Sequence, residues 1–266
     1  MKKIFYIFAA ATAILASCEK EIDLDYKDID PLPVIEGILS SENTEVKFTR
    51  TRNMGDSVKS PGIQCESVRI IGEDGTAVEL DFGSDGVYRP AQNIDVEPGR
   101  TYTLEVKNDG LTYTAQSTAS EPVKTTGPEF VWAEFVDWMQ CWEFLVVDNS
   151  DSVEKFLRIN IFRNGKIYYW GTTSGKGEFP VDLGLYYDSD MEFDEEMILY
   201  DGDKMRFEIM TIDRATYDYL YGLQIDNMNP APIFRCSDPD VTCLGYFSAM
   251  VTVQVQEVVY EKTKHP

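Results

Sequence analysis

Histidine is nearly absent from this chain of 266 residues, because the only one is His265, next to the C-terminus. Catalysis by a serine or cysteine nucleophile needs a histidine held beside it, and little can hold a side chain at that position. The cysteines show no CxxC or Cys/His spacing of the kind that zinc sites use. Pairs of carboxylates, as in glycosidases, occur through abundance alone among 46 acidic residues. The sequence therefore predicts no enzyme activity and no cofactor.

Positive charge is also scarce. The chain has 24 Lys and Arg residues against 46 Asp and Glu residues, which gives a formal net charge of −22. Nucleic acids and anionic lipid head groups both need clusters of basic residues. We therefore expect no nucleic-acid partner, and a membrane attachment that depends on covalent lipid rather than on surface charge. The excess of acid is otherwise typical of a soluble, self-repelling surface.

Only one long apolar run is present, from Ile4 to Leu15, and it follows Lys2 and Lys3. It is shorter than the roughly 20 residues of a membrane-spanning helix, which argues against a plain transmembrane anchor, and it has the layout of a secretory signal peptide. The run ends in Leu15-Ala16-Ser17-Cys18, which resembles the lipobox of bacterial lipoproteins. Residues 1–17 are therefore predicted to be a signal peptide, and Cys18 is predicted to be acylated and anchored in the outer membrane.

Residues 18–33 are acidic and contain Pro31 and Pro33, so we expect an extended tether between the membrane and the folded body. Glu19-Lys20-Glu21 resembles the signal that sends some Bacteroidota lipoproteins to the outer face of the outer membrane. Cell-surface exposure is therefore predicted, and a periplasmic orientation stays open.

Four cysteines besides Cys18 are present, and an exported chain can keep disulfides. Cys236 and Cys243 flank a short polar, proline-containing stretch that could close into a bridge. Cys65 and Cys141 lie in different halves of the chain and are expected to be buried thiols. The pair Cys236 and Cys243 is thus the candidate disulfide.

Residues 34–120 show period-two alternation of apolar and polar residues, broken by turn sequences. Tyr102, Leu104 and Val106 share one face of a strand, and Asn108-Asp109-Gly110 then turns the chain into the next strand. Several short strands at this spacing predict an immunoglobulin-like β-sandwich without helices.

Glu121 to Glu129 contains proline and glycine in a polar stretch and is predicted to be a linker. Beyond it, residues 130–261 are rich in aromatic side chains and show further strand signals, including an Asn164-Gly165 turn. One short helix is predicted near residues 213–222, with Asp213 as its N-cap. The overall prediction is a mostly β chain: an immunoglobulin-like sandwich followed by a second antiparallel β domain that carries one short helix.

Several blocks of the sequence resemble the domain of unknown function 4249 family of Bacteroidota outer-membrane lipoproteins. They are Glu21-Ile22-Asp23-Leu24, Val34-Ile35-Glu36-Gly37, Pro98-Gly99-Arg100-Thr101, Thr211-Ile212-Asp213-Arg214 and Leu244-Gly245-Tyr246-Phe247-Ser248-Ala249. The last block is the most specific one. Where family members often carry a small residue before it, this chain has Cys243.

The resemblance implies context rather than chemistry. Such lipoproteins tend to be encoded beside SusC/SusD-type importers, in which a TonB-dependent barrel is covered by a lid lipoprotein. We therefore expect a non-catalytic accessory subunit of a nutrient importer that acts by tethering and protein–protein contact. The alternatives are a free-standing lipoprotein that binds carbohydrate or peptide, and a structural role in outer-membrane assembly.

Two groups of residues are candidate ligand sites, and each has a simpler explanation. Aromatic rings suit sugar or peptide ligands, but strand alternation predicts that at least part of the aromatic set is core. The acidic run from Asp188 offers oxygen ligands at alternate positions, as calcium sites need, but it lacks the glycine of an EF-hand and also fits a solvated loop. The candidates are Tyr168, Trp170, Trp138 and Trp142 for ligand contact, and Asp188, Asp190 and Glu192 for calcium.

Overall fold

The computed structural model describes residues 30–53, 61–132, 139–147, 153–187, 198–225 and 233–261. In these residues the chain is mostly β with a single helix, as the sequence predicts. The first strands are β1 (Pro33–Leu39), β2 (Glu45–Arg50), β3 (Ser67–Gly72), β4 (Ala77–Phe82), β5 (Val87–Pro90), β6 (Thr101–Asn108) and β7 (Leu111–Thr118). The later elements are β8 (Lys124–Thr125), β9 (Glu129–Trp132), β10 (Met139–Val147), β11 (Glu154–Arg163), β12 (Lys166–Lys176), β13 (Phe179–Tyr187), β14 (Lys204–Thr211), α2 (Arg214–Gln224), β15 (Arg235–Cys236), β16 (Leu244–Ala249) and β17 (Val251–Val259).

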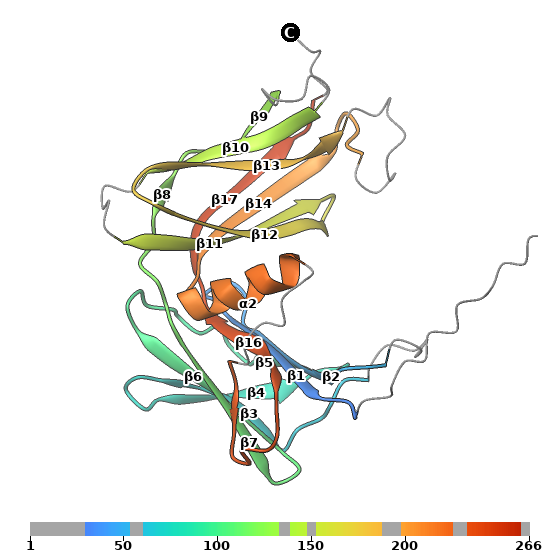
Figure 1. Cartoon of the computed structure of the whole chain (residues 1–266), viewed down its shortest axis with the longest axis vertical. Coiled ribbons are helices and arrows are strands. Elements are labelled where there is room, and N and C mark those ends of the chain that lie inside the picture. Colours follow the sequence, from blue (N-terminus) through green and yellow to red (C-terminus); the bar gives the residue numbers. More distant parts are fainter. Residues whose placement is uncertain are drawn as a thin grey trace, which may run out of the picture.

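The first body is an immunoglobulin-like sandwich (Figure 1). Among the described strands, its sheet has the order β15-β7-β6-β3-β4-β5-β2-β1-β16 and folds over on itself at β4, so that β1, β2 and β5 face β3, β6 and β7. Tyr102, at the start of β6, accepts a hydrogen bond at its hydroxyl from the backbone N–H of Glu97 at 2.9 Å and donates one to the carbonyl of Asp95 at 3.4 Å. This bond back to the preceding loop is the tyrosine corner of immunoglobulin-like domains. The predicted sandwich is confirmed.

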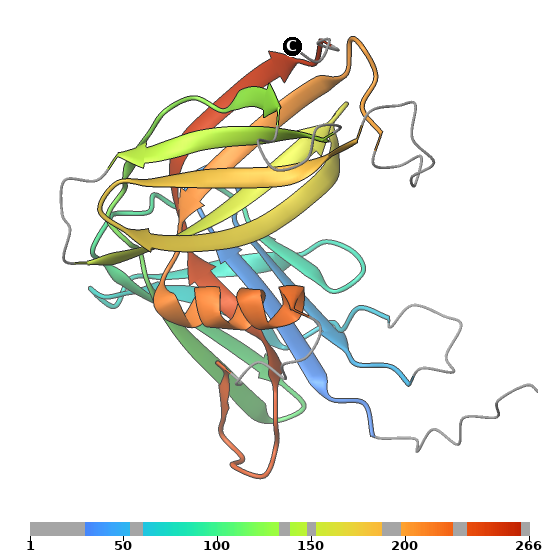
Figure 2. The same cartoon turned by 45° about the horizontal axis from the view of Figure 1, so that its top comes forward.

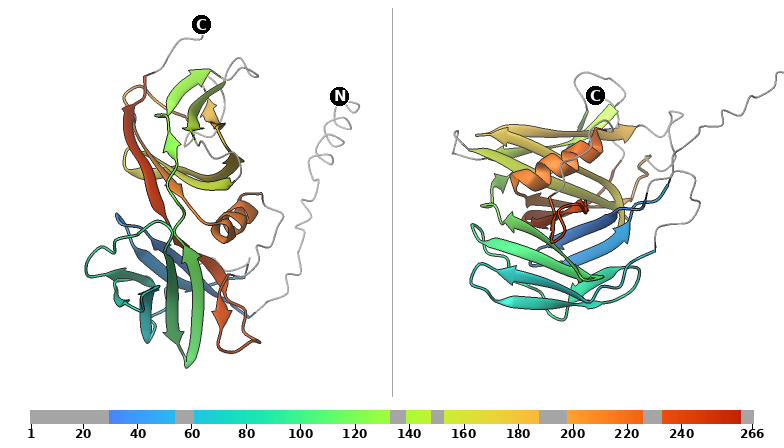
Figure 3. Two further views of the ribbon diagram at one scale, coloured as in Figure 1. Left: turned by 90° about the vertical axis from the view of Figure 1, so that its left-hand side faces the viewer. Right: turned by 60° about the horizontal axis from the view of Figure 1, so that its bottom comes forward.

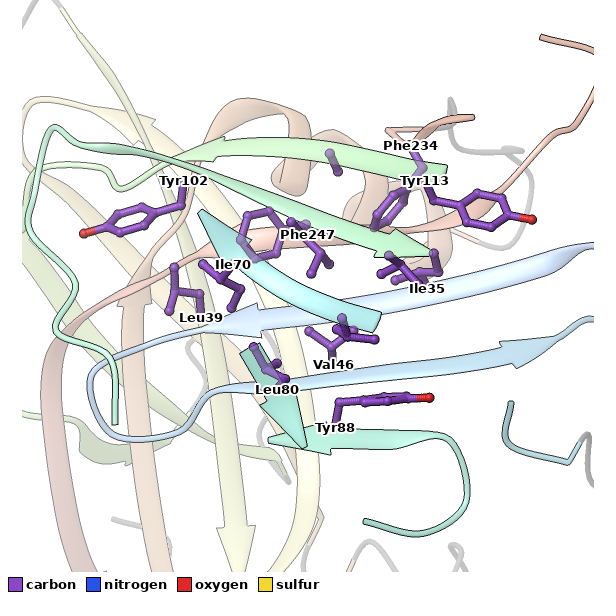
Figure 4. Close-up of a cluster of buried hydrophobic side chains, with 14 of the residues drawn as sticks. Ile35, Leu39, Val46, Ile70, Leu80, Tyr88, Tyr102, Tyr113, Phe234 and Phe247 are labelled. Carbon is purple, nitrogen blue, oxygen red and sulfur yellow. The ribbon is translucent and has the colours of Figure 1, made fainter. Parts of the chain in front are cut away.

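The alternation in the sequence explains the core of this body (Figure 4). Every second side chain of β6 is buried, and these residues pack against the inner faces of β1, β2 and β16. Gly37 in β1 is part of this packing, because a Cβ there would lie 2.9 Å from side-chain carbons of both Leu104 and Phe247. The two layers are therefore in direct contact at the centre of the sandwich.

The second body is also a sandwich, and all of its described strand pairs are antiparallel. One described sheet has the order β13-β10-β8, with β9 also paired to β10, and the other has the order β12-β11-β14-β17. We call the latter sheet D. The inward side chains of β11 and β14 meet those of β10 in a core that includes Trp142, Phe144 and Phe207. Figure 2 shows these layers from above.

The bodies do not follow one another simply along the chain. The prediction placed residues 130–261 in the second domain, yet β15 pairs with β7 and β16 pairs in parallel with β1, both in the first body. The physical reason is that β16 pairs along the edge of β1 and its Phe247 packs into the core of the first body. Within the described residues the chain therefore crosses between the bodies three times, after β7, after β14 and after β16.

Helix α2 packs at the junction between the bodies, and the left-hand view of Figure 3 looks nearly along its axis. The Oδ1 atom of Asp213 accepts a hydrogen bond from the backbone N–H of Thr216 at 2.8 Å, which confirms the predicted N-cap. The helix ends at Gln224 rather than near Gly222. Its buried residues Tyr219 and Leu220 pack against Tyr246 of β16. In the part of the chain that is described, no helix is long and apolar enough to span a membrane.

The three crossings are joined by hydrogen bonds. The Ser117 hydroxyl donates to Oδ2 of Asp213 and accepts a bond from the backbone N–H of Ala249 at 2.8 Å. The Ser120 hydroxyl donates to the carbonyl of Ile212 at 2.9 Å. Among the described residues, these hydrogen bonds hold the two bodies to each other at the junction.

Candidate binding cleft between the two sandwiches

The predicted aromatic ligand contacts are distributed between core and junction. Trp142 is only 2% exposed and packs on Phe207 with ring centroids 4.6 Å apart, so its ring is not offered to a ligand. Tyr168 packs against the core of the second body, and Trp170 packs against the apolar cluster under α2. Trp138 lies outside the described residues. The structure does not bring these residues together as one binding surface.

Cys18, the predicted lipidation site, and the calcium candidates Asp188, Asp190 and Glu192 also lie outside the described residues. Where the chain is described, no group of three or more His, Cys, Asp or Glu side chains is placed to hold a metal ion.

Cys236 and Cys243 are free thiols in the structure, and their disulfide stays a prediction. Both pack in or against the core of the first body. Burial raises the pKa of the Cys243 thiol to about 12. Cys65 shares this behaviour, because burial raises its pKa to about 11. Neither thiol has the lowered pKa of a nucleophile.

The outer face of sheet D is the surface that both bodies help to shape. Because paired residues on neighbouring strands point to the same side, Phe156, Arg158, Asn160 and Phe162 of β11 share this face with alternate residues of β14. Helix α2 and its apolar cluster cover the end near Phe156. The hairpin between β1 and β2 lies beside the middle of the face, and the far end, near Phe162, is open.

A row of polar side chains crosses the middle of this face. Arg158 lies between the rings of Trp170 and Tyr246, 5.7 and 5.9 Å from their centroids, and its Nε donates to Oδ1 of Asn160 at 3.1 Å. The Asn160 amide nitrogen donates to Oε2 of Glu208 at 3.4 Å. Glu208 forms an ion pair with Arg206 at 2.8 Å through its other oxygen. The aromatic rings thus hold one end of a connected polar row.

Asn160, Glu208 and Arg206 of this row line a cleft of about 460 Å³ between the bodies. The first body contributes the end of β1 and the β1–β2 hairpin, and the second contributes β11, β14 and the start of β17. The cleft is lined by Ile38, Ser40, Glu42, Asn43, Asn160, Phe162, Arg206, Glu208, Met210, Met250 and Thr252. Its size and its position at a domain interface are those of small-molecule sites.

Several polar groups of the cleft have no partner among the described residues. The side chains of Glu42 and Asn43 and the hydroxyl of Thr252 make no hydrogen bond there, and Arg206 uses one nitrogen for its ion pair. Glu208 is largely enclosed, with 17% of its side chain exposed. The cleft therefore offers donors and acceptors on both sides of a partly enclosed space.

The open end of sheet D adjoins the cleft through Phe162 and Arg206 and forms a second hollow of about 450 Å³. Exposed apolar side chains lie on the same face: Ile167, Val255 and Val259 are 57%, 41% and 54% exposed. Ile167 belongs to the edge strand β12 and the two valines to the opposite edge strand β17, with charged side chains of β14 between them. An outer sheet face that exposes apolar side chains is a candidate interaction surface.

Sequence reasoning missed the cleft. The alternation of Leu157, Ile159 and Ile161 predicts which side chains of β11 face the core, and by the same rule it places Arg158 and Asn160 on the opposite face. The local pattern cannot show that the β1–β2 hairpin of the first body forms the other wall of the cleft.

Comparison with curated proteins finds no match. Among solved structures, a two-domain fibronectin type III segment from chicken tenascin is similar, with 9% sequence identity and a TM-score of 0.21, over 88% of this chain and 100% of that one. The family model described as a domain of unknown function, DUF4249, matches residues 19–256, and the chain belongs to this family.

Proposed function

We propose that this chain is a non-catalytic, lipid-anchored lipoprotein of the cell surface that serves as an accessory subunit of a SusC/SusD-type TonB-dependent nutrient importer. Acylation at Cys18 would confine it to the membrane plane and raise its concentration near the barrel and lid lipoprotein. One observation supports contact with another protein: Ile167, Val255 and Val259 are exposed apolar side chains on the outer face of sheet D, on its two edge strands.

Membrane attachment is tested by Cys18→Ala. The variant should move from the detergent-extracted membrane fraction to the soluble fraction on cell fractionation, because the acyl chains are the proposed anchor. Cys65→Ala is the control and should stay with the membrane. A Cys18→Ala variant that sediments with the outer membrane would contradict lipid anchoring.

Partner contact is tested by a pull-down of the tagged, natively lipidated chain, read by mass spectrometry. Stoichiometric recovery of a TonB-dependent barrel with its lid lipoprotein is the expected result. The double variant Ile167→Glu/Val259→Glu should lose them, because it puts charge into an apolar contact. Leu223→Glu changes a similarly exposed apolar residue on α2 and should recover them. Recovery of the chain alone would contradict the accessory role.

A second function, a free-standing carbohydrate- or peptide-binding lipoprotein, is favoured by a different observation. The cleft between the bodies is lined by polar groups that have no side-chain partner among the described residues. A glycan affinity gel separates the two functions, because a protein that acts by protein contact alone should not be retarded.

A further inference from the structure

We propose that the cleft between the two sandwiches binds a short neutral oligosaccharide, of the size of a di- or trisaccharide. The inference rests on the second of the two proposed functions and assigns it a site and a ligand class. It is independent of the apolar end of sheet D, on which the importer contact depends.

The first argument is the chemistry of the cleft wall. Sugar hydroxyls donate and accept hydrogen bonds at once, so they suit planar groups that present both kinds of atom. The Asn160 amide presents both kinds of atom, whereas the Glu208 carboxylate only accepts and the Arg206 guanidinium only donates. The three groups line the cleft side by side on β11 and β14, so together they offer donors and acceptors.

The second argument is that other hydrogen-bonding groups of the cleft, on both walls, are unused. Asn43 and Glu42 from the β1–β2 hairpin, and Thr252 from β17, have no side-chain partner among the described residues. Glu42 and Asn43 are exposed, so water satisfies them in the free protein, and a hydroxyl-rich ligand can take the place of that water on both walls at once.

The third argument is that the wall is already held in shape. The side-chain oxygen of Asn160, Oδ1, accepts a hydrogen bond from Arg158. Arg158 is itself held between the rings of Trp170 and Tyr246 and donates to the Tyr246 hydroxyl at 3.0 Å. Because these side chains are already held in place, binding costs little free energy for ordering them. A weakly apolar ligand can therefore still bind measurably. Phe162 supplies one ring beside Arg206 at the open side of the cleft.

Charge sets the ligand class to neutral. Glu42 and Glu208 lie in the cleft with only Arg206 to balance them, and the whole chain carries a net charge of −22. Uronic acids and sulfated glycans would therefore be repelled.

The experiment is a glycan array of neutral and acidic oligosaccharides, probed with the full natively processed chain in a detergent that has no sugar head group. Neutral hits are then titrated by calorimetry. We expect millimolar or tighter binding to at least one neutral glycan and none to acidic glycans. Retention of no neutral glycan, or of acidic glycans only, would overturn the proposal.

Variants locate the binding. Glu208→Gln and Thr252→Val preserve shape and should each weaken binding about tenfold, because the first replaces a charged acceptor by a neutral amide and the second removes a hydroxyl that hydrogen-bonds the ligand. Gln116→Ala is the matched control, because it changes a separate hollow of about 390 Å³ on β6 and β7. Unchanged melting temperatures show that the variants fold. Binding that survives both cleft variants but is lost in Gln116→Ala would overturn the proposed site.

The outcome is separable from that of the importer contact. If glycan binding fails while the barrel is recovered by pull-down, only the cleft proposal falls. If the glycan binds and no barrel is recovered, the accessory role falls and the binding function stands.

Discussion

A Cβ atom on Gly245 would lie 1.8 Å from the carbonyl oxygen of Ile35. Gly245 lies opposite Ile35 in the parallel pairing of β16 with β1, and its φ of +109° belongs to the region that favours glycine. The glycine of the most specific family block is thus explained by the approach of two strands from opposite ends of the chain.

Gly245→Ala should therefore lower the free energy of unfolding by about 4 kcal/mol or prevent folding, because the overlap is with backbone that cannot move aside. Gly75→Ala is the control: Gly75 has a φ of +81° but nothing within 4 Å of an added Cβ, so only backbone strain of about 1 kcal/mol applies. Urea unfolding of both variants measures the difference. Equal losses would contradict the steric explanation.

Asp213→Ala should destabilise the protein by about 2 kcal/mol or more. The change removes the cap of α2 and also the acceptor of the Ser117 hydroxyl at the junction. Asp218→Ala, on the exposed side of the same helix, should cost only about 0.5 kcal/mol, the value of an exposed ion pair with Arg214. Chemical unfolding followed by circular dichroism gives both free energies of unfolding. An equal loss of stability in the two variants would show that the hydrogen bonds of Asp213 at the cap and the junction contribute no more than an exposed ion pair.

Trp142→Ala should lower the free energy of unfolding by about 3–5 kcal/mol, because the ring fills the core of the second body. A ligand-contact residue on the surface would cost far less. Thermal unfolding is the measurement. A variant with unchanged stability but lost glycan or peptide binding would restore Trp142 as a contact residue.

Stability should fall in alkaline solution as pH rises above about 9. The unfolded Cys243 thiol loses its proton near its ordinary pKa of 9.0, whereas burial holds the folded pKa at about 12. Between these values the unfolded state binds fewer protons, so the free energy of unfolding decreases with pH. Cys65 adds to the effect, since its pKa is raised to about 11.

Urea unfolding at pH 8 and pH 10, with reductant present to keep thiols free, measures this slope. Cys243→Ala should make the slope shallower while Cys65 keeps part of it. An identical slope in the variant would show that the Cys243 thiol ionises equally in both states.

Much of the fold could be predicted because its signals are local. Period-two alternation locates the inward residues of β6 and β11, and the predicted turn sequences contain positive φ angles at Asp109 and Asn164. The cap at Asp213 is equally local, since the carboxylate and the N–H it accepts from are three residues apart.

The return of β16 to β1 could not be predicted, because parallel pairing between distant segments leaves no local pattern. The cleft shares this property. Asn43 and Glu208 line it together only because three chain crossings fix the bodies to each other. The aromatic residues, in contrast, were visible in the sequence, but composition alone does not distinguish the buried Trp142 from a ring at a surface.

The position of β16 also constrains the order of folding. The first sandwich lacks one of its edge strands, and Phe247 of its core, until the chain has been synthesised as far as Ala249. Its strands must therefore wait, with the β1 edge unpaired, while most of the second body is synthesised. Such an edge is a template for pairing with other chains. A chain truncated between the bodies should therefore aggregate rather than form a stable first sandwich.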